Sequence, residues 1–79
     1  MPALVMIVDD DAAVCWALER ALARAGHRVA VCASADDALR HIVRQPPALV
    51  ITDQRMPGGS GLDLLAALRR DHPRLPVVL

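Results

Sequence analysis

The sequence contains no phenylalanine, no tyrosine and no lysine, and its only aromatic residue is Trp16. Because 54% of its residues are nevertheless hydrophobic, we expect a globular chain with an aliphatic core. Its nine basic residues, all arginines, equal its nine acidic residues in number, so neither a basic nucleic-acid-binding surface nor an acidic tail is indicated. Seventy-nine residues can form one small domain and are too few for two.

Long hydrophobic runs and clustered metal-binding residues are also missing. No apolar run approaches the length of a membrane span, and the first three residues do not form a positively charged leader, so we expect a cytoplasmic protein that binds no membrane. Cys15 and Cys32 lack the close spacing of a zinc or redox motif and are expected to be two buried thiols. The three histidines are scattered, which does not indicate a histidine metal site.

Short apolar runs alternate with segments of helical periodicity. Strands are expected at residues 4–8, 28–32, 48–52 and 76–79. Helices are expected from Ala12 to the stop at Gly26, from the cap Ser34 to Gln45, and from the cap Ser60 to Asp71. This alternation predicts an α/β fold, a doubly wound parallel sheet with right-handed crossovers and helices on both faces.

Apolar residues at helical spacing predict which face of each helix is buried. In the first helix these are Val14, Ala17, Leu18, Ala21, Leu22 and Ala25. In the second they are Ala35, Ala38, Leu39 and Ile42, and in the third Leu62, Leu65 and Leu68.

Acidic residues follow two of the predicted strands. Asp9, Asp10 and Asp11 close the first apolar run, and Asp53 closes the third. The carboxyl ends of neighbouring parallel strands meet at one edge of a sheet, so these acids should converge. Such a cluster must raise its pKa values or recruit a cation, which predicts a Mg²⁺-dependent phosphoryl site. Capping needs a single acid, and we assign Asp11 to the cap of the first helix.

The segment after Asp53 is rich in turn residues. Residues 56–61 contain three of the four glycines, so the backbone there should need unusual dihedral angles or a close approach to another group.

Three segments, Ile7–Asp11, Thr52–Gly58 and Ser60–Leu62, resemble the receiver domains of two-component response regulators. The resemblance covers all 79 residues. Within this family, Trp16–Leu22 and Arg55–Gly58 are most similar to nitrogen-regulation activators of the NtrC type. The resemblance to receiver domains implies a flavodoxin-like, CheY-like sheet with strand order 2-1-3-4. Residues 1–79 would form the N-terminal part of a single receiver domain, in which the fifth strand and the last two helices are missing.

The resemblance also implies a function and a set of site residues. Asp53 would be the phospho-acceptor, taking its phosphoryl group from a sensor histidine kinase. The implied Mg²⁺ ligands are Asp9, Asp10, Asp53 and the backbone carbonyl of Arg55, with Asp10 in direct contact and Asp9 more often acting through water. The implied supporting loop is Met56, Pro57 and Gly58. The chain would be a phospho-switch module of a transcriptional regulator and not an enzyme.

Departures from the family are also expected to matter. The chain ends before the Ser or Thr and the Lys through which receiver domains switch, so competent switching is not expected. Cys15 stands where NtrC-like sequences tend to carry a basic residue, and we expect it to leave the site chemistry untouched. ATPase and DNA-binding domains are expected only in a full-length parent, and no nucleic acid is expected to bind this fragment.

Two other functions fit parts of the sequence. Asp9 and Asp11 have the Asp-x-Asp spacing of haloacid-dehalogenase-type phosphatases, in which Asp9 would be the nucleophile, although Asp53 and Met56–Pro57 count against this reading. Alternatively, the unpaired edge of the fourth strand would make the chain a non-signalling dimerisation fragment that forms a homodimer.

Overall fold

The computed structural model describes residues 3–56 and 59–79. Four parallel strands form one sheet in the spatial order β2-β1-β3-β6. They are β1 (Leu4–Val8), β2 (Arg28–Cys32), β3 (Leu49–Thr52) and β6 (Val77–Val78). Since β6 is the fourth of these strands along the chain, the order 2-1-3-4 and the fold class are confirmed. β3 begins one residue later than expected, and β6 has only two of the four expected residues.

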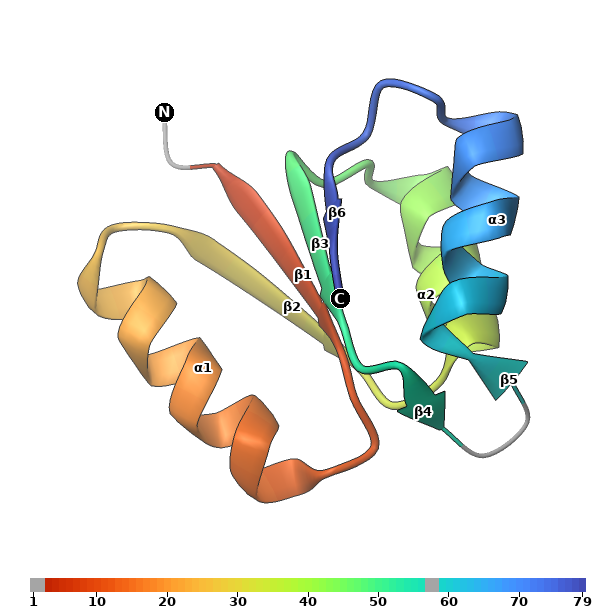
Figure 1. The fold of residues 1–79 in the computed structure, drawn as a ribbon. Helices are drawn as coiled ribbons and strands as arrows, with labels where there is room; N and C mark the ends of the chain where they lie inside the picture. Colours follow the sequence, from red (N-terminus) through yellow and green to blue (C-terminus); the bar gives the residue numbers. More distant parts are fainter. Residues whose placement is uncertain (1–2, 57–58) are drawn as a thin grey trace.

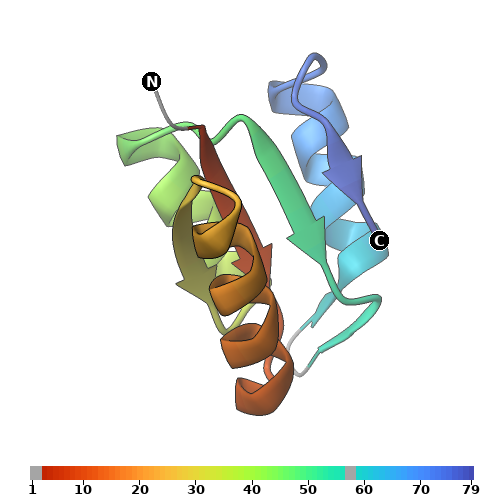
Figure 2. The same cartoon turned by 90° about the vertical axis from the view of Figure 1, so that its left-hand side faces the viewer.

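Helices cover both faces of the sheet. α1 (Ala12–Arg24) packs on one face, whereas α2 (Ala35–Arg44) and α3 (Gly61–Asp71) lie together on the other (Figures 1 and 2). The main core lies between the sheet and the α2 and α3 helices. Its members are Met6, Val8, Cys32, Ala38, Ile42, Val50, Leu64 and Leu68. No helix in the described ranges is long and apolar enough to cross a membrane.

The helix ends follow the chemistry expected of them. The Asp11 side chain caps α1 by accepting hydrogen bonds from the main-chain N–H groups of Ala13 and Val14, as predicted. Ser34 caps α2 by accepting a 3.1 Å hydrogen bond from the N–H of Asp37. Gly26 follows α1 with a φ of +89°, a conformation that a residue without a side chain adopts at little cost.

The buried faces of α1 and α3 differ in part from those predicted. Leu62 is 57% exposed, while Leu64 and Leu68 are 1% and 0% exposed, so the expectation that Leu62 faces inward was wrong. An α-helix has 3.6 residues per turn, so residues spaced three apart do not stay on one face. The face of α3 that lies against the sheet carries Leu64 and Leu68. In α1, Cys15 is buried and Val14 is 40% exposed, because only one side of this helix lies against β1 and β2.

The glycine-rich segment contains structure that the sequence did not predict. Arg55–Met56 (β4) pairs with Gly59–Ser60 (β5) as a short antiparallel ribbon. The ribbon lies between the end of β3 and the start of α3 (Figure 1). Two-residue strands are too short to show a period in the sequence, so only a loop was predicted.

Candidate functional site

Sheet register places the two acidic strand ends next to each other. Val8, the last residue of β1, pairs with Thr52, the last residue of β3. Asp53 then donates its N–H to the Val8 carbonyl at 2.9 Å, and Asp9 donates its N–H to the Cys32 carbonyl at 3.0 Å. Asp9 and Asp53 therefore leave neighbouring strands at the same edge of the sheet.

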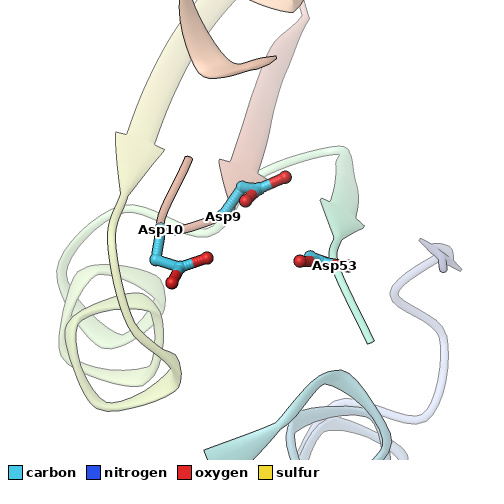
Figure 3. Close-up of side chains that lie close together, drawn as sticks. All are labelled: Asp9, Asp10 and Asp53. Atoms are coloured by element: carbon cyan, nitrogen blue, oxygen red, sulfur yellow. The ribbon is translucent and has the colours of Figure 1, made fainter. Parts of the chain in front are cut away.

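The side chains of Asp9, Asp10 and Asp53 form one cluster. Each can offer a carboxylate oxygen such that all three oxygens lie within 4.8 Å of one another. Asp9 is half-buried, whereas Asp10 and Asp53 are exposed and their carboxylates point toward each other (Figure 3). Hard oxygen donors of this kind suit Mg²⁺, which is usually bound by one or two carboxylates and several waters. The residues present therefore fit the predicted ion.

The third acid of the triplet has a different task. The Asp11 carboxylate turns into the first turn of α1 as its cap, while the N–H of Asp11 donates a 2.9 Å hydrogen bond to Oδ1 of Asp9. The sequence-based division of labour, with Asp11 structural and Asp9 and Asp10 at the edge of the sheet, matches this geometry. The turn that carries the acids is thereby joined to the helix that follows it.

Main-chain packing holds Asp53 in place. The buried Thr52 hydroxyl donates a 3.1 Å hydrogen bond to the Asp53 carbonyl, and the N–H of Gly61 donates one of 3.0 Å to the Gln54 carbonyl. A Cβ atom added to Gly61 would lie 2.1 Å from the Asp53 carbonyl oxygen. The sequence pointed to close approach somewhere among the glycines. It did not identify Gly61 as the residue against which the main chain of Asp53 packs.

The structure describes the remaining predicted site residues only in part. Arg55 lies in β4, where its main chain pairs with Ser60, and the role of its carbonyl as a metal ligand stays a prediction. Pro57 and Gly58 lie outside the described residues, as does the side chain of Met56.

A hollow of about 360 Å³ adjoins the cluster, and Asp9, Asp10, Cys15 and Trp16 are among its lining residues. Trp16 is 61% exposed, and the Arg20 guanidinium lies 4.8 Å from the centre of its ring. This contact is a cation–π pair at the surface.

Both thiols are free and buried, as predicted. Burial raises the pKa of Cys15, and the negative charges of Asp9, Asp11 and Asp10 raise it further. Burial also raises the pKa of Cys32. The Cys15 thiol donates a hydrogen bond to the Asp9 carbonyl, with 3.4 Å between sulfur and oxygen.

Comparison with known proteins settles the family. The profile described as "Response regulator receiver domain" matches residues 5–79. The chain belongs to the response regulator receiver domain family. Receiver domains of this family are signalling modules that bind Mg²⁺ at an acidic pocket and interact with histidine kinases.

The relatives of this receiver domain include nitrogen regulators. It is 40% identical over 76 residues to the DNA-binding transcriptional regulator NtrC of Salmonella typhimurium, covering 96% of this chain and 16% of that protein. It is 43% identical over 79 residues to the transcriptional regulatory protein AfsQ1 of Streptomyces coelicolor, covering the whole chain and 34% of the relative. The solution structure of the NtrC receiver domain superimposes with a TM-score of 0.87 at 40% identity, covering 95% of this chain and 60% of that one. The chain is thus an NtrC-like receiver that spans only part of these proteins.

Proposed function

We propose that Asp53 accepts a phosphoryl group from the phosphohistidine of a sensor histidine kinase, in a reaction that depends on Mg²⁺. Asp9, Asp10, Asp53 and the backbone carbonyl of Arg55 would hold the ion. The observation that carries this proposal is the convergence of three carboxylates from two strand ends to within 4.8 Å. Like charges this close repel one another, and a divalent cation removes that repulsion.

The transfer forms one bond and breaks one. An Asp53 carboxylate oxygen attacks phosphorus, the phosphorus–nitrogen bond of the phosphohistidine breaks, and an acyl phosphate remains on Asp53. When bound, Mg²⁺ neutralises the negative charge on the transferring group. Asp53 is exposed, so a partner's phosphohistidine can reach it. Thr52 and Gly61 support the main chain of Asp53 and so fix the position from which it attacks.

The same proposal limits what this chain does. We take residues 1–79 as the N-terminal part of one receiver domain. The family match over residues 5–79 supports a single receiver domain, and coverage of 60% of the NtrC receiver structure supports that it is a part. DNA binding is stated for a relative of which the chain spans 16%, and the equal numbers of basic and acidic residues give the chain no basic surplus that would favour it. We therefore propose that the histidine kinase is the partner of this chain and that nucleic acid is not. Homodimer formation stays a prediction.

Labelling with a small phosphodonor tests the proposal. The chain is incubated with acetyl phosphate, with and without Mg²⁺, and the addition of one phosphoryl group is followed by intact mass. Wild type, Asp53→Asn and Asp9→Asn are compared, with Asp36→Asn, an exposed acid of α2, as the control. We expect labelling of the wild type and of the control only when Mg²⁺ is present, and none of Asp53→Asn.

Each other outcome has a definite meaning. If Asp9→Asn abolishes labelling while Asp53→Asn is still labelled, Asp9 is the nucleophile and the phosphatase-like reading replaces this one. If the folded wild type is not labelled under any condition, the proposed acceptor chemistry is wrong for this chain.

A further inference from the structure

Cys15 joins helix α1 to the turn that carries the acids. Its main-chain N–H donates a 3.1 Å hydrogen bond to the Asp11 carbonyl, as expected in the first turn of a helix. Its thiol reaches past the helix cap to the Asp9 carbonyl, six residues earlier, with 3.4 Å between sulfur and oxygen. Only 7% of Cys15 is exposed. The end of β1 and the start of α1 are therefore held together by one buried side chain.

The carbonyl that the thiol contacts has a particular position. It belongs to the peptide group between Asp9 and Asp10, and a peptide group is planar and rigid. Fixing the direction of this carbonyl restricts ψ of Asp9 and φ of Asp10, and with them the direction in which the Asp10 side chain leaves the main chain. In the described part of the chain no hydrogen bond holds the Asp10 carboxylate, so its position depends on the direction that the main chain gives its Cα–Cβ bond and on its own side-chain rotamer.

We propose that Cys15 is a positioning residue for the Mg²⁺ site, holding the Asp9–Asp10 peptide so that the Asp10 carboxylate faces Asp53. The proposal rests on the proposed function, because it concerns how the same three carboxylates are arranged. It revises the expectation that a cysteine at this position leaves the site untouched. The thiol acts as a hydrogen-bond donor to the main chain and does not bind the ion.

The chain offers a matched control in Cys32. The two cysteines are equally buried, at 6% and 7% exposure, but the Cys32 side chain packs into the core beneath α2 and α3. Its main-chain carbonyl accepts the N–H of Asp9, a bond that substitution of the side chain preserves. Replacing either cysteine therefore removes a buried thiol, but only replacement of Cys15 also removes a side-chain contact to the acidic turn.

The experiment compares Cys15→Ser and Cys15→Val with Cys32→Ser and Cys32→Val. Serine keeps a donor and is smaller than cysteine, whereas valine has no donor and is larger. MgCl₂ is titrated into each folded protein, and the fluorescence of Trp16, which lines the hollow beside Asp9 and Asp10, reports binding. We expect Cys15→Val to weaken Mg²⁺ binding by about threefold to tenfold, the range of one modest hydrogen bond. Cys15→Ser and both Cys32 variants should bind within about twofold of wild type, because each keeps the donor to the Asp9 carbonyl.

Equal weakening by serine and valine at position 15 would overturn the proposal, since it would show that packing alone matters. Equal weakening by the Cys32 variants would overturn it as well, because the effect would then be one of general stability. If Cys15→Val does not fold, Cys15→Ala removes the donor without added bulk and takes its place. If neither folds, Cys15→Ser decides, because weakening beyond about threefold contradicts the role of the donor. If wild type itself does not bind Mg²⁺, the proposed function fails first and this inference fails with it.

Discussion

Replacing Gly61 with alanine tests how tightly the main chain of the acceptor residue is packed. Gly61 is buried at the start of α3, and its N–H is bonded to the Gln54 carbonyl at 3.0 Å. The new Cβ atom would lie 2.1 Å from the Asp53 carbonyl oxygen and 2.9 Å from its carbon, whereas ordinary contacts are 3.4–4 Å. Both clashing atoms belong to the main chain, so no side-chain rotation relieves the contact. α3 or the Asp53 segment must move.

The two effects of this substitution on stability have opposite signs. Alanine is a better helix former than glycine by up to about 1 kcal/mol, which favours the variant. Forcing an extra carbon into a packed region costs about 1–3 kcal/mol, and an overlap this deep between main-chain atoms belongs at the upper end of that range. We therefore expect a net loss of about 1–2 kcal/mol in the free energy of unfolding. We also expect weaker Mg²⁺ binding and slower labelling of Asp53.

Urea unfolding and acetyl phosphate labelling of the same preparations provide the measurement. The control is Gly26→Ala, where φ is +89° and no atom lies within 4 Å of the added carbon. That variant should lose about 1 kcal/mol through backbone strain. It should label normally, because Gly26 lies before the first residue of β2 whereas Asp53 follows the last residue of β3. The two residues are therefore at opposite ends of these parallel strands. A Gly61→Ala protein as stable as wild type, or one that loses stability yet binds Mg²⁺ and labels normally, would refute the packing argument.

Three further predictions concern stability. Asp11→Ala removes the cap of α1 and should lower the free energy of unfolding by about 1 kcal/mol in urea, and no change would mean that the cap is redundant. Leu64→Ala should lower the free energy of unfolding by about 2–5 kcal/mol and Leu62→Ala by less than about 0.5 kcal/mol. A larger loss for Leu62→Ala than for Leu64→Ala would mean that Leu62 faces the core, as the sequence predicted. Burial raises the pKa of Cys15 and Cys32 in the folded chain, so stability should be complete below the ordinary thiol pKa of 9.0 and fall as pH rises through the raised values. Urea midpoints at pH 7.5 and 10 check this, and a profile unchanged by Cys32→Ser would contradict the assignment to that thiol.

The parts of the fold that the sequence predicted correctly depend on short-range rules. Strand-length apolar runs, helix caps and the glycine after α1 each follow from a few neighbouring residues. The convergence of Asp9 and Asp53 needed one additional rule, that parallel strands end at a common edge. That rule is independent of side-chain detail, which is why the acidic cluster could be foreseen without a structure.

The parts that were missed depend on how the elements pack. Which of Leu62 and Leu64 faces the core is decided by the angle at which α3 lies on the sheet, and a helical period alone leaves that choice open. The contact between Gly61 and Asp53 joins residues eight apart across the β4–β5 ribbon. The thiol of Cys15 bonds to a carbonyl, and carbonyls are present at every residue, so no sequence pattern marks this partner.

The three consecutive acids show how main-chain geometry distinguishes chemically identical residues. Asp11 has the extended φ and ψ of a helix cap, so its carboxylate turns back onto free N–H groups of α1. Asp9 directly follows β1 and still donates its N–H to the Cys32 carbonyl of β2, while its Oδ1 accepts the N–H of Asp11, which leaves its second oxygen available to a cation. Asp10 lies between these two constraints with an unbonded carboxylate, and the peptide that joins it to Asp9 sets the direction of its Cα–Cβ bond. Substitutions at Cys15 that remove the hydrogen-bond donor should therefore weaken Mg²⁺ binding, while those at Asp11 should act mainly on the stability of the helix.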